Sequence, residues 1–141
     1  MIREVVQGQI WTASLRDTEE LVSPEAMGAY AGRGIRCVLT VAEDVRPRCV
    51  AMLPQLCLPV NEVEVTPLHY FDLACQFHLT FGPILVHCNA GVNRSTAFAA
   101  ALCYRVWAMG LAQAIRAADA VPGFVLRSME AWAAAPLREG A

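Results

Sequence analysis

The chain of 141 residues and 15.3 kDa is long enough for one domain, which buries about two thirds of its unfolded surface without disulfides or a metal. A formal net charge of −2 without a basic run argues against nucleic acid or an anionic membrane as the main partner. Arg105 interrupts the longest apolar stretch, so no membrane segment is predicted. Because the N-terminus also lacks a signal-peptide pattern, we expect a single cytoplasmic domain over residues 1–141, as a monomer.

The elements are predicted from apolar periodicity and from the residues that begin and end helices. The predicted strands are 9–13 (at the sheet edge), 35–41, 55–60 and 84–86. The predicted helices are one from Ser23 to Gly32, one from Thr66 to the break at Gly82, and those at 95–107, 111–120 and 124–132. Strands that alternate with helices indicate an α/β fold, with a central, mostly parallel, twisted sheet of about four to five strands and helices on both faces.

Two of the predicted helices carry further expectations about burial. The helix after Thr66 has an apolar side made of Leu68, Phe71, Cys75 and Leu79. Its solvent side includes His69, Asp72 and His78. The helix over 95–107 is apolar nearly all round, which predicts that it is buried. Packing is also the favoured role of Trp11, Trp107 and Trp132.

The six cysteines are spread along the chain without a CxxC pair. Several lie in apolar runs, and no export signal precedes them, so reduced thiols are predicted rather than a secreted disulfide scaffold. A disulfide between Cys88 and Cys37, Cys57 or Cys103 stays open, although core packing is the favoured interpretation of these three residues.

The stretch over residues 87–95 carries the most specific signal in the chain. An apolar run at 81–86 precedes it and an Ala-rich helical run follows, so a strand, a loop and a helix come in that order. Five residues separate Cys88 from Arg94, and Gly91 between them allows the loop to curl until its backbone N–H groups converge. Such a nest at a helix N-terminus binds an oxyanion.

The side chains of this stretch suit phosphate chemistry. The helix N-terminus and a guanidinium favour the thiolate form of Cys88, which makes it a nucleophile. Arg94 is planar and always charged, so it can hold two phosphate oxygens, and Ser95 can donate a hydrogen bond to the sulfur when the sulfur leaves. His87 is expected to orient the loop rather than to act as a base. The predicted phosphate cradle is Asn89, Ala90, Gly91, Val92, Asn93 and Arg94.

These residues resemble the HCxxGxxR[ST] signature of the cysteine-dependent protein phosphatases, and the flanks resemble the compact dual-specificity branch. The likeness covers nearly the whole chain, from the first predicted strand to the helix with Trp132. It implies a phosphotyrosine-phosphatase-like fold and hydrolysis of phosphomonoesters through a phosphocysteine intermediate. It also implies a phosphorylated protein or small molecule as substrate, and no cofactor or metal is predicted.

One position departs from the family's pattern. Members of this branch carry a general-acid Asp nine residues before an aromatic pair, and counting back from Tyr70-Phe71 gives Asn61. An amide cannot protonate a leaving alkoxide, and loss of a general acid costs about 10²–10⁴ in rate. Glu62 or Glu64 can substitute through a small shift of the loop, and replacing Asn61 with Asp is then expected to speed the cleavage of alkyl phosphates.

Other interpretations stay open. An aryl oxide or a phosphoanhydride leaves without an acid, as in the cysteine-type RNA 5′-triphosphatases, which share an Asn at the position of Asn93 but have a basic balance that this chain lacks. A weak or inactive, pseudophosphatase-like module that binds phosphate is another alternative. A sulfurtransferase is disfavoured, because the His-Cys and Arg-Ser pairs indicate phosphate. Glu43, after the strand at 35–41, is a candidate contact of Arg94, although a solvated acid is the favoured interpretation.

Overall fold

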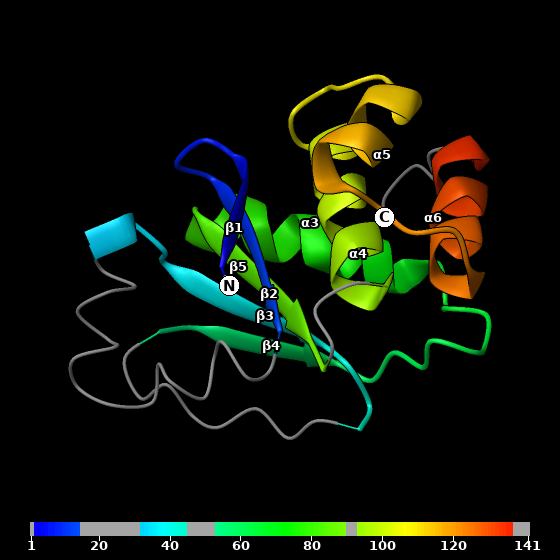
Figure 1. The fold of residues 1–141 in the computed structure, drawn as a ribbon, viewed down its shortest axis with the longest axis horizontal. Coiled ribbons are helices and arrows are strands. Elements are labelled where there is room, and N and C mark those ends of the chain that lie inside the picture. Colours follow the sequence, from blue (N-terminus) through cyan, green and yellow to red (C-terminus); the bar gives the residue numbers. More distant parts are fainter. Residues whose placement is uncertain (1, 15–31, 45–52, 90–92, 137–141) are drawn as a thin grey trace.

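The computed structural model describes residues 2–14, 32–44, 53–89 and 93–136. The strands are β1 (Arg3–Val6), β2 (Ile10–Ser14), β3 (Cys37–Val41), β4 (Gln55–Leu58) and β5 (Ile84–Cys88). The longer helices among these residues are α3 (His69–Phe81), α4 (Asn93–Arg105), α5 (Leu111–Ala118) and α6 (Phe124–Ala134). Figure 1 shows the sheet with these helices gathered beside it.

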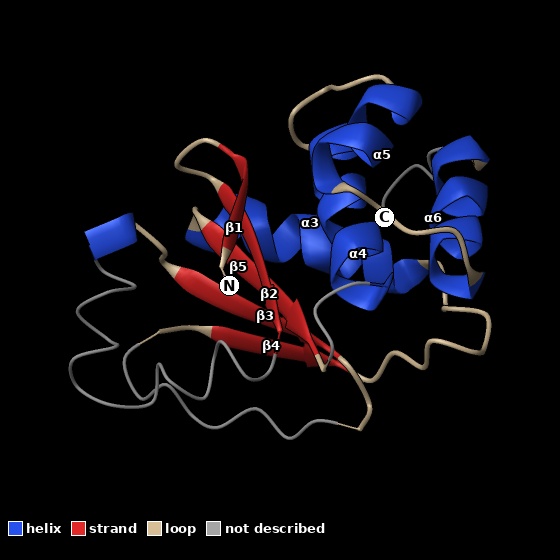
Figure 2. Cartoon of the chain, viewed as in Figure 1, coloured by secondary structure: helices blue, strands red, loops and turns tan. Residues whose placement is uncertain are grey.

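The five strands form one sheet in the order β1-β2-β5-β3-β4. Neighbours from β2 through β5 and β3 to β4 are parallel, and only β1 runs antiparallel to β2. This confirms the predicted α/β class and the mostly parallel sheet. Because parallel strands end at the same edge, the described residues that directly follow β3, β4 and β5 lie at that edge (Figure 2). A ligand site is therefore expected at this edge.

The prediction that the first strand lies at the sheet edge is wrong. β2 lies between β1 and β5, because residues 3–6 add a strand outside it. The two strands are joined by a tight turn in which Gly8 has a φ of +69° and the Gln9 N–H donates to Val6 O (2.9 Å). Glycine adopts that conformation without steric cost. The four residues of β1 are too few to show a clear alternation in the sequence.

Helix α4 is the centre of the core. Every residue from Arg94 to Cys103 is buried, which confirms the prediction for a helix that is apolar nearly all round. The helix packs on β2, β3 and β5 and is flanked by α3, α5 and α6. Its alanines allow these neighbours to approach closely, and Phe98 stacks on Phe71 of α3 with 4.5 Å between ring centroids. The N-terminus of α4 is thus held firmly at the edge where the strands end.

The other face of the sheet carries a smaller apolar cluster. Its buried members are Trp11, Ala13, Ile35 and Leu85. The helix predicted to start at Ser23 lies outside the described residues, except that residues 32–33 are helical and are followed by Gly34, which has a φ of +87°. Most of the segment at 46–53 also lies outside them. The described helices α3 to α6 therefore account for one of the two predicted helical layers.

Helix α3 buries a face that coincides only in part with the predicted one, since Phe71 and Cys75 are buried as expected and Leu68 and Leu79 are exposed. Leu79 is 65 % exposed, whereas His78, expected at the surface, is 4 % exposed. The buried residues are Phe71, Ala74, Cys75, Phe77 and His78. The buried positions follow the helical period of about 3.6 residues per turn. The predicted positions are four residues apart, so the last of them, Leu79, lies away from the buried face. Phe81 belongs to this helix and not to the strand, because Gly82 ends the helix with a φ of +93°.

The buried His78 is held by two hydrogen bonds. The indole N–H of Trp107 donates to Nε2 (3.1 Å), so the N–H at Nδ1 donates to Gly82 O (2.7 Å). Burial lowers the pKa of His78, which keeps the ring neutral in this arrangement. Trp107 is partly exposed, while Trp11 and Trp132 are buried as predicted. Asp72 is exposed as expected and accepts a hydrogen bond from Trp132 Nε1 (3.0 Å).

No helix within the described ranges is long and apolar enough to cross a membrane.

Candidate active site

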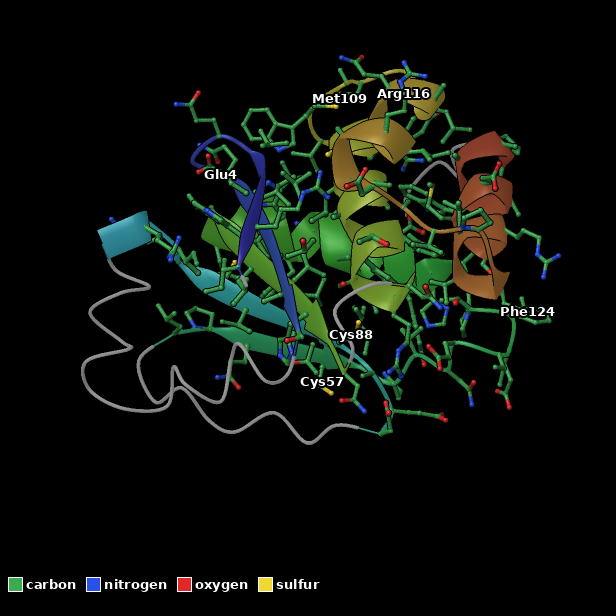
Figure 3. The ribbon with its side chains drawn as sticks, in the orientation of Figure 1. Glu4, Cys57, Cys88, Met109, Arg116 and Phe124 are labelled. Carbon is green, nitrogen blue, oxygen red and sulfur yellow. The ribbon has the colours of Figure 1, made fainter. Side chains whose placement is uncertain are left out.

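The strand and the helix predicted on the two sides of the loop after Cys88 are present. β5 ends at Cys88, which is 1 % exposed, and α4 begins at Asn93. Figure 3 shows Cys88 at the carboxyl end of β5, next to the first turn of α4. Of the predicted phosphate cradle, Asn89, Asn93 and Arg94 are described, while 90–92 lie outside the described residues. The structure therefore places Cys88 at a helix N-terminus, at the centre of the sheet edge.

Arg94 lies in the first turn of α4 and is 5 % exposed. Its Nη1 donates to Asp44 Oδ1 (2.6 Å) and to Val60 O (3.0 Å). Its Nε is buried and has no partner among the described residues. An unpartnered buried donor is uncommon in folded proteins, because its desolvation is not compensated. The guanidinium is thus held through Nη1 and by a longer hydrogen bond from Nη2 to Asp44 Oδ2 (3.5 Å), and its Nε is left able to bind an oxyanion.

Charge supports this arrangement. The hydrogen bond from Arg94 lowers the pKa of Asp44 against the opposing effect of burial, and Asn89 Nδ2 donates a further bond to Asp44 Oδ2 (3.1 Å). Burial lowers the pKa of Arg94, but the bond and charge of Asp44 and the charges of Cys88 and Glu62 outweigh burial and raise it. Arg94 therefore stays cationic, with Cys88 and Glu62 close enough to act on its charge.

Asp44 is a site residue that the sequence did not single out. Glu43 was the candidate contact of Arg94, and the structure gives this contact to the next residue. Glu43 turns instead toward the loop after β4, where it accepts a hydrogen bond from Asn61. The sequence signal was present, because two acids follow a buried parallel strand at the edge where ligand groups gather. Which of two adjacent side chains points inward depends on the turn that follows β3.

His87 lies on the opposite face of β5 from Cys88, because side chains alternate along a strand. Its Nε2 shares a hydrogen bond of 2.7 Å with Thr40 Oγ1 of β3, the residue opposite it in the sheet. Burial lowers the pKa of His87 to about 4, so the ring is neutral at physiological pH. The hydrogen-bond partner of the His87 ring is thus a hydroxyl on the neighbouring strand, and this bond links the end of β5 to β3.

The depressed pKa of His87 predicts a loss of stability in acid. In the unfolded chain this histidine has a pKa near 6.5, so it takes up a proton there first. The contribution of His87 to the free energy of unfolding is therefore fully present above pH 6.5 and is lost as pH falls toward 4. Between about pH 8 and about pH 5 we expect a loss of about 2 kcal/mol from this residue. Urea unfolding at the two pH values measures it. His78 contributes in the same direction, so His87→Asn should reduce the pH slope without abolishing it, and an unchanged slope would contradict the assignment.

Asn61 and Glu62 lie in the loop after β4, as predicted. The Val63 N–H donates to Asn61 Oδ1 (2.9 Å), and Asn61 Nδ2 donates to Glu43 Oε1 (2.7 Å). Glu62 is exposed, and its charge is among those that stabilise the charged form of Arg94, whereas the charge of Glu64 is not. Of the two acids that the sequence left open, Glu62 is therefore the one near Arg94.

Ser95 lies in the first turn of α4, directly after Arg94. Its hydroxyl is fully buried and has no hydrogen-bond partner among the described residues. The O–H of Ser95 can therefore donate a hydrogen bond to a group that becomes negatively charged during a reaction.

None of the described cysteines, which exclude Cys49, forms a disulfide. Cys57 is exposed on β4, two strands from β5 and on the face opposite Cys88, about 10 Å away between backbones. Core packing was therefore the wrong prediction for Cys57. Burial raises the pKa of Cys37 to about 12 and of Cys103 to about 11, as core thiols require. Among the described residues, no group of three or more His, Cys, Asp or Glu side chains is arranged to hold a metal ion.

The strands and helices form a compact α/β domain with a mostly parallel five-stranded sheet. No model of a protein family and no curated protein matches the sequence. Solved structures do match the fold. Human DUSP28 is 18 % identical with a TM-score of 0.78, over 93 % of this chain and 91 % of its own. A human tyrosine phosphatase-like serine/threonine/tyrosine-interacting protein is 18 % identical with a TM-score of 0.75, over 93 % and 94 % of the two chains.

A third similar structure is PTPMT1 in complex with PI(5)P, which is 19 % identical with a TM-score of 0.71, over 94 % of both chains. The chain therefore has the fold of the compact dual-specificity phosphatases, as its resemblance to their signature implied.

Proposed function

We propose that residues 1–141 act as a single-domain, cysteine-dependent phosphatase that hydrolyses phosphomonoesters, with protein tyrosine or dual-specificity substrates as the class. The observation that carries this proposal is the pair made by Cys88 and Arg94. Cys88 ends the central strand at a helix N-terminus, and Arg94 is fixed through Nη1 while its buried Nε has no partner among the described residues. A tetrahedral oxyanion bound to such a guanidinium is in position for attack by a neighbouring sulfur.

In the first step, the Cys88 thiolate attacks phosphorus, a sulfur–phosphorus bond forms and the bond to the leaving oxygen breaks. Arg94 and the backbone amides of the loop stabilise the charge on the phosphoryl oxygens. Glu62, in its protonated form, gives its proton to the leaving oxygen. In the second step, Glu62 takes a proton from water, whose oxygen attacks phosphorus, and the sulfur leaves as a thiolate that accepts a hydrogen bond from Ser95.

Glu62 is proposed as the general acid because it follows Asn61 in the loop and its charge acts on Arg94. A carboxylate near the phosphate site can reach the leaving oxygen, whereas the amide of Asn61 carries no transferable proton. Asp72 is not a substitute, because it lies on α3, where it bonds Trp132.

A second candidate function is a module that binds phosphorylated partners without turnover. The amide at position 61 favours it, and one structural neighbour is described as a phosphatase-like interacting protein. Intact Cys88, Arg94 and Ser95 favour the enzyme, because binding alone does not require a buried thiol below the phosphate site. The phosphoinositide bound to PTPMT1 keeps lipid phosphates among the substrates to be tested.

Phosphate release from an aryl phosphate and from a phosphoserine peptide tests the proposal. We expect turnover of both, with the aryl phosphate faster because aryl oxide is the better leaving group. Turnover of the aryl phosphate alone would show that no acid operates. Turnover of neither, with retained binding of inorganic phosphate, would favour the binding module.

A further inference from the structure

We propose that Asn61 is a positioning residue that, together with Glu43, fixes the turn that presents Glu62 to the substrate. The inference rests on the proposed function, in which Glu62 is the acid. At the position where the family's pattern has an acid, this chain then requires an amide.

Both ends of the Asn61 side chain are in use. Its oxygen accepts the Val63 N–H (2.9 Å), which closes a turn around Glu62. Its nitrogen donates to Glu43 Oε1 (2.7 Å), which anchors the turn to the loop after β3. A carboxamide supplies an acceptor and a donor on one planar group, and a carboxylate supplies acceptors only.

The hydrogen bond between Asn61 and Glu43 is connected to Arg94 through neighbouring residues. The Glu43 N–H donates to Val60 O (3.1 Å), and the same carbonyl accepts Arg94 Nη1 (3.0 Å). Asp44, the neighbour of Glu43, holds the same Nη1 (2.6 Å). The turn with Glu62, the loop after β3 and the guanidinium are therefore joined through adjacent residues, so a shift at the Glu43–Asn61 bond moves the acid relative to the bound phosphate.

Aspartate at position 61 breaks this arrangement. It would place two carboxylates within hydrogen-bond distance of each other, where like charges repel. The expectation from the family's pattern, that Asn61→Asp speeds the cleavage of alkyl phosphates, is thereby reversed. A misplaced catalytic group costs up to about 100-fold for a shift of about 1 Å.

The test is to exchange the carboxamide of Asn61 and the carboxylate of Glu43 between the two positions. We expect Asn61→Asp to lower kcat for a phosphoserine peptide by about 10- to 100-fold, with KM and aryl phosphate turnover nearly unchanged. Glu43→Gln alone should lower kcat much less than Asn61→Asp, because its amide oxygen still accepts from Asn61. The double variant should recover most of the lost kcat, because the amide introduced at position 43 then donates to the carboxylate introduced at position 61, which can still accept the Val63 N–H. Glu130→Gln, an exposed acid on α6, controls for the loss of one charge.

The inference is overturned if Asn61→Asp matches or exceeds the parent on the peptide, or if the double variant is no better than Asn61→Asp. If the parent turns over neither substrate, the proposed function fails, and with it the role of the turn in presenting an acid. The urea midpoint then still tests the bond: Asn61→Asp should lower it and Glu43→Gln should restore it in the double variant.

Discussion

Replacing Cys88 by Ser should abolish turnover of aryl phosphates, with a fall in kcat of at least about 10⁴. A serine hydroxyl is not ionised at neutral pH, and His87, although neutral, lies on the other face of β5 and cannot act as its base. Loss of a hydrolase nucleophile can cost as much as about 10⁶ in kcat. The measurement is steady-state release of the aryl alcohol, with trapping of the phosphocysteine in the parent.

The same variant should keep its affinity for inorganic phosphate, measured by calorimetry, because the amides and Arg94 are untouched. Cys57→Ser is the matched control, since Cys57 is exposed on β4 and away from the site. Cleavage by Cys88→Ser at the parent rate would refute the mechanism, and loss of activity in Cys57→Ser alone would place the nucleophile elsewhere.

Glu62→Gln should lower kcat for a phosphoserine peptide by about 10²–10⁴, the usual cost of a lost general acid. The loss should be much smaller for an aryl phosphate, because aryl oxide leaves without full protonation. The ratio of the two rates therefore reports on the acid directly, and it is insensitive to small changes in the fraction of folded protein. Glutamine preserves the size and polarity of the side chain and removes only the proton.

Glu64→Gln is the comparison for this variant. Glu64 lies two residues further along the same loop, is likewise exposed and does not act on the charge of Arg94. A large loss in Glu64→Gln with none in Glu62→Gln would assign the acid to Glu64. Equal losses on aryl and peptide substrates in Glu62→Gln would mean that Glu62 affects binding or folding and does not protonate the leaving group.

Much of the fold was readable because its signals are local. These signals are the glycines at positions 34 and 82, the alternation of strands and helices, and the apolar surface of α4. Each of them depends on residues that are neighbours in the sequence. Errors arose where burial depends on which face a neighbour covers. His78 has a polar side chain, yet it falls on the buried face of α3 and finds partners at Trp107 and Gly82.

The sequence by itself determined the strand that ends at Cys88 and the helix that carries Arg94, because the apolar pattern of each is local. Only the tertiary structure decided what holds them. Asp44 and Arg94 are 50 residues apart, and Glu43 and Asn61 are 18 apart, and they meet because β3, β4 and β5 are parallel neighbours that end at one edge. The sequence shows which acids follow β3, whereas the backbone conformation after β3 decides whether Glu43 or Asp44 reaches the guanidinium of Arg94. The role of Asn61 depends on the same choice, since its amide has a partner only where Glu43 turns toward it.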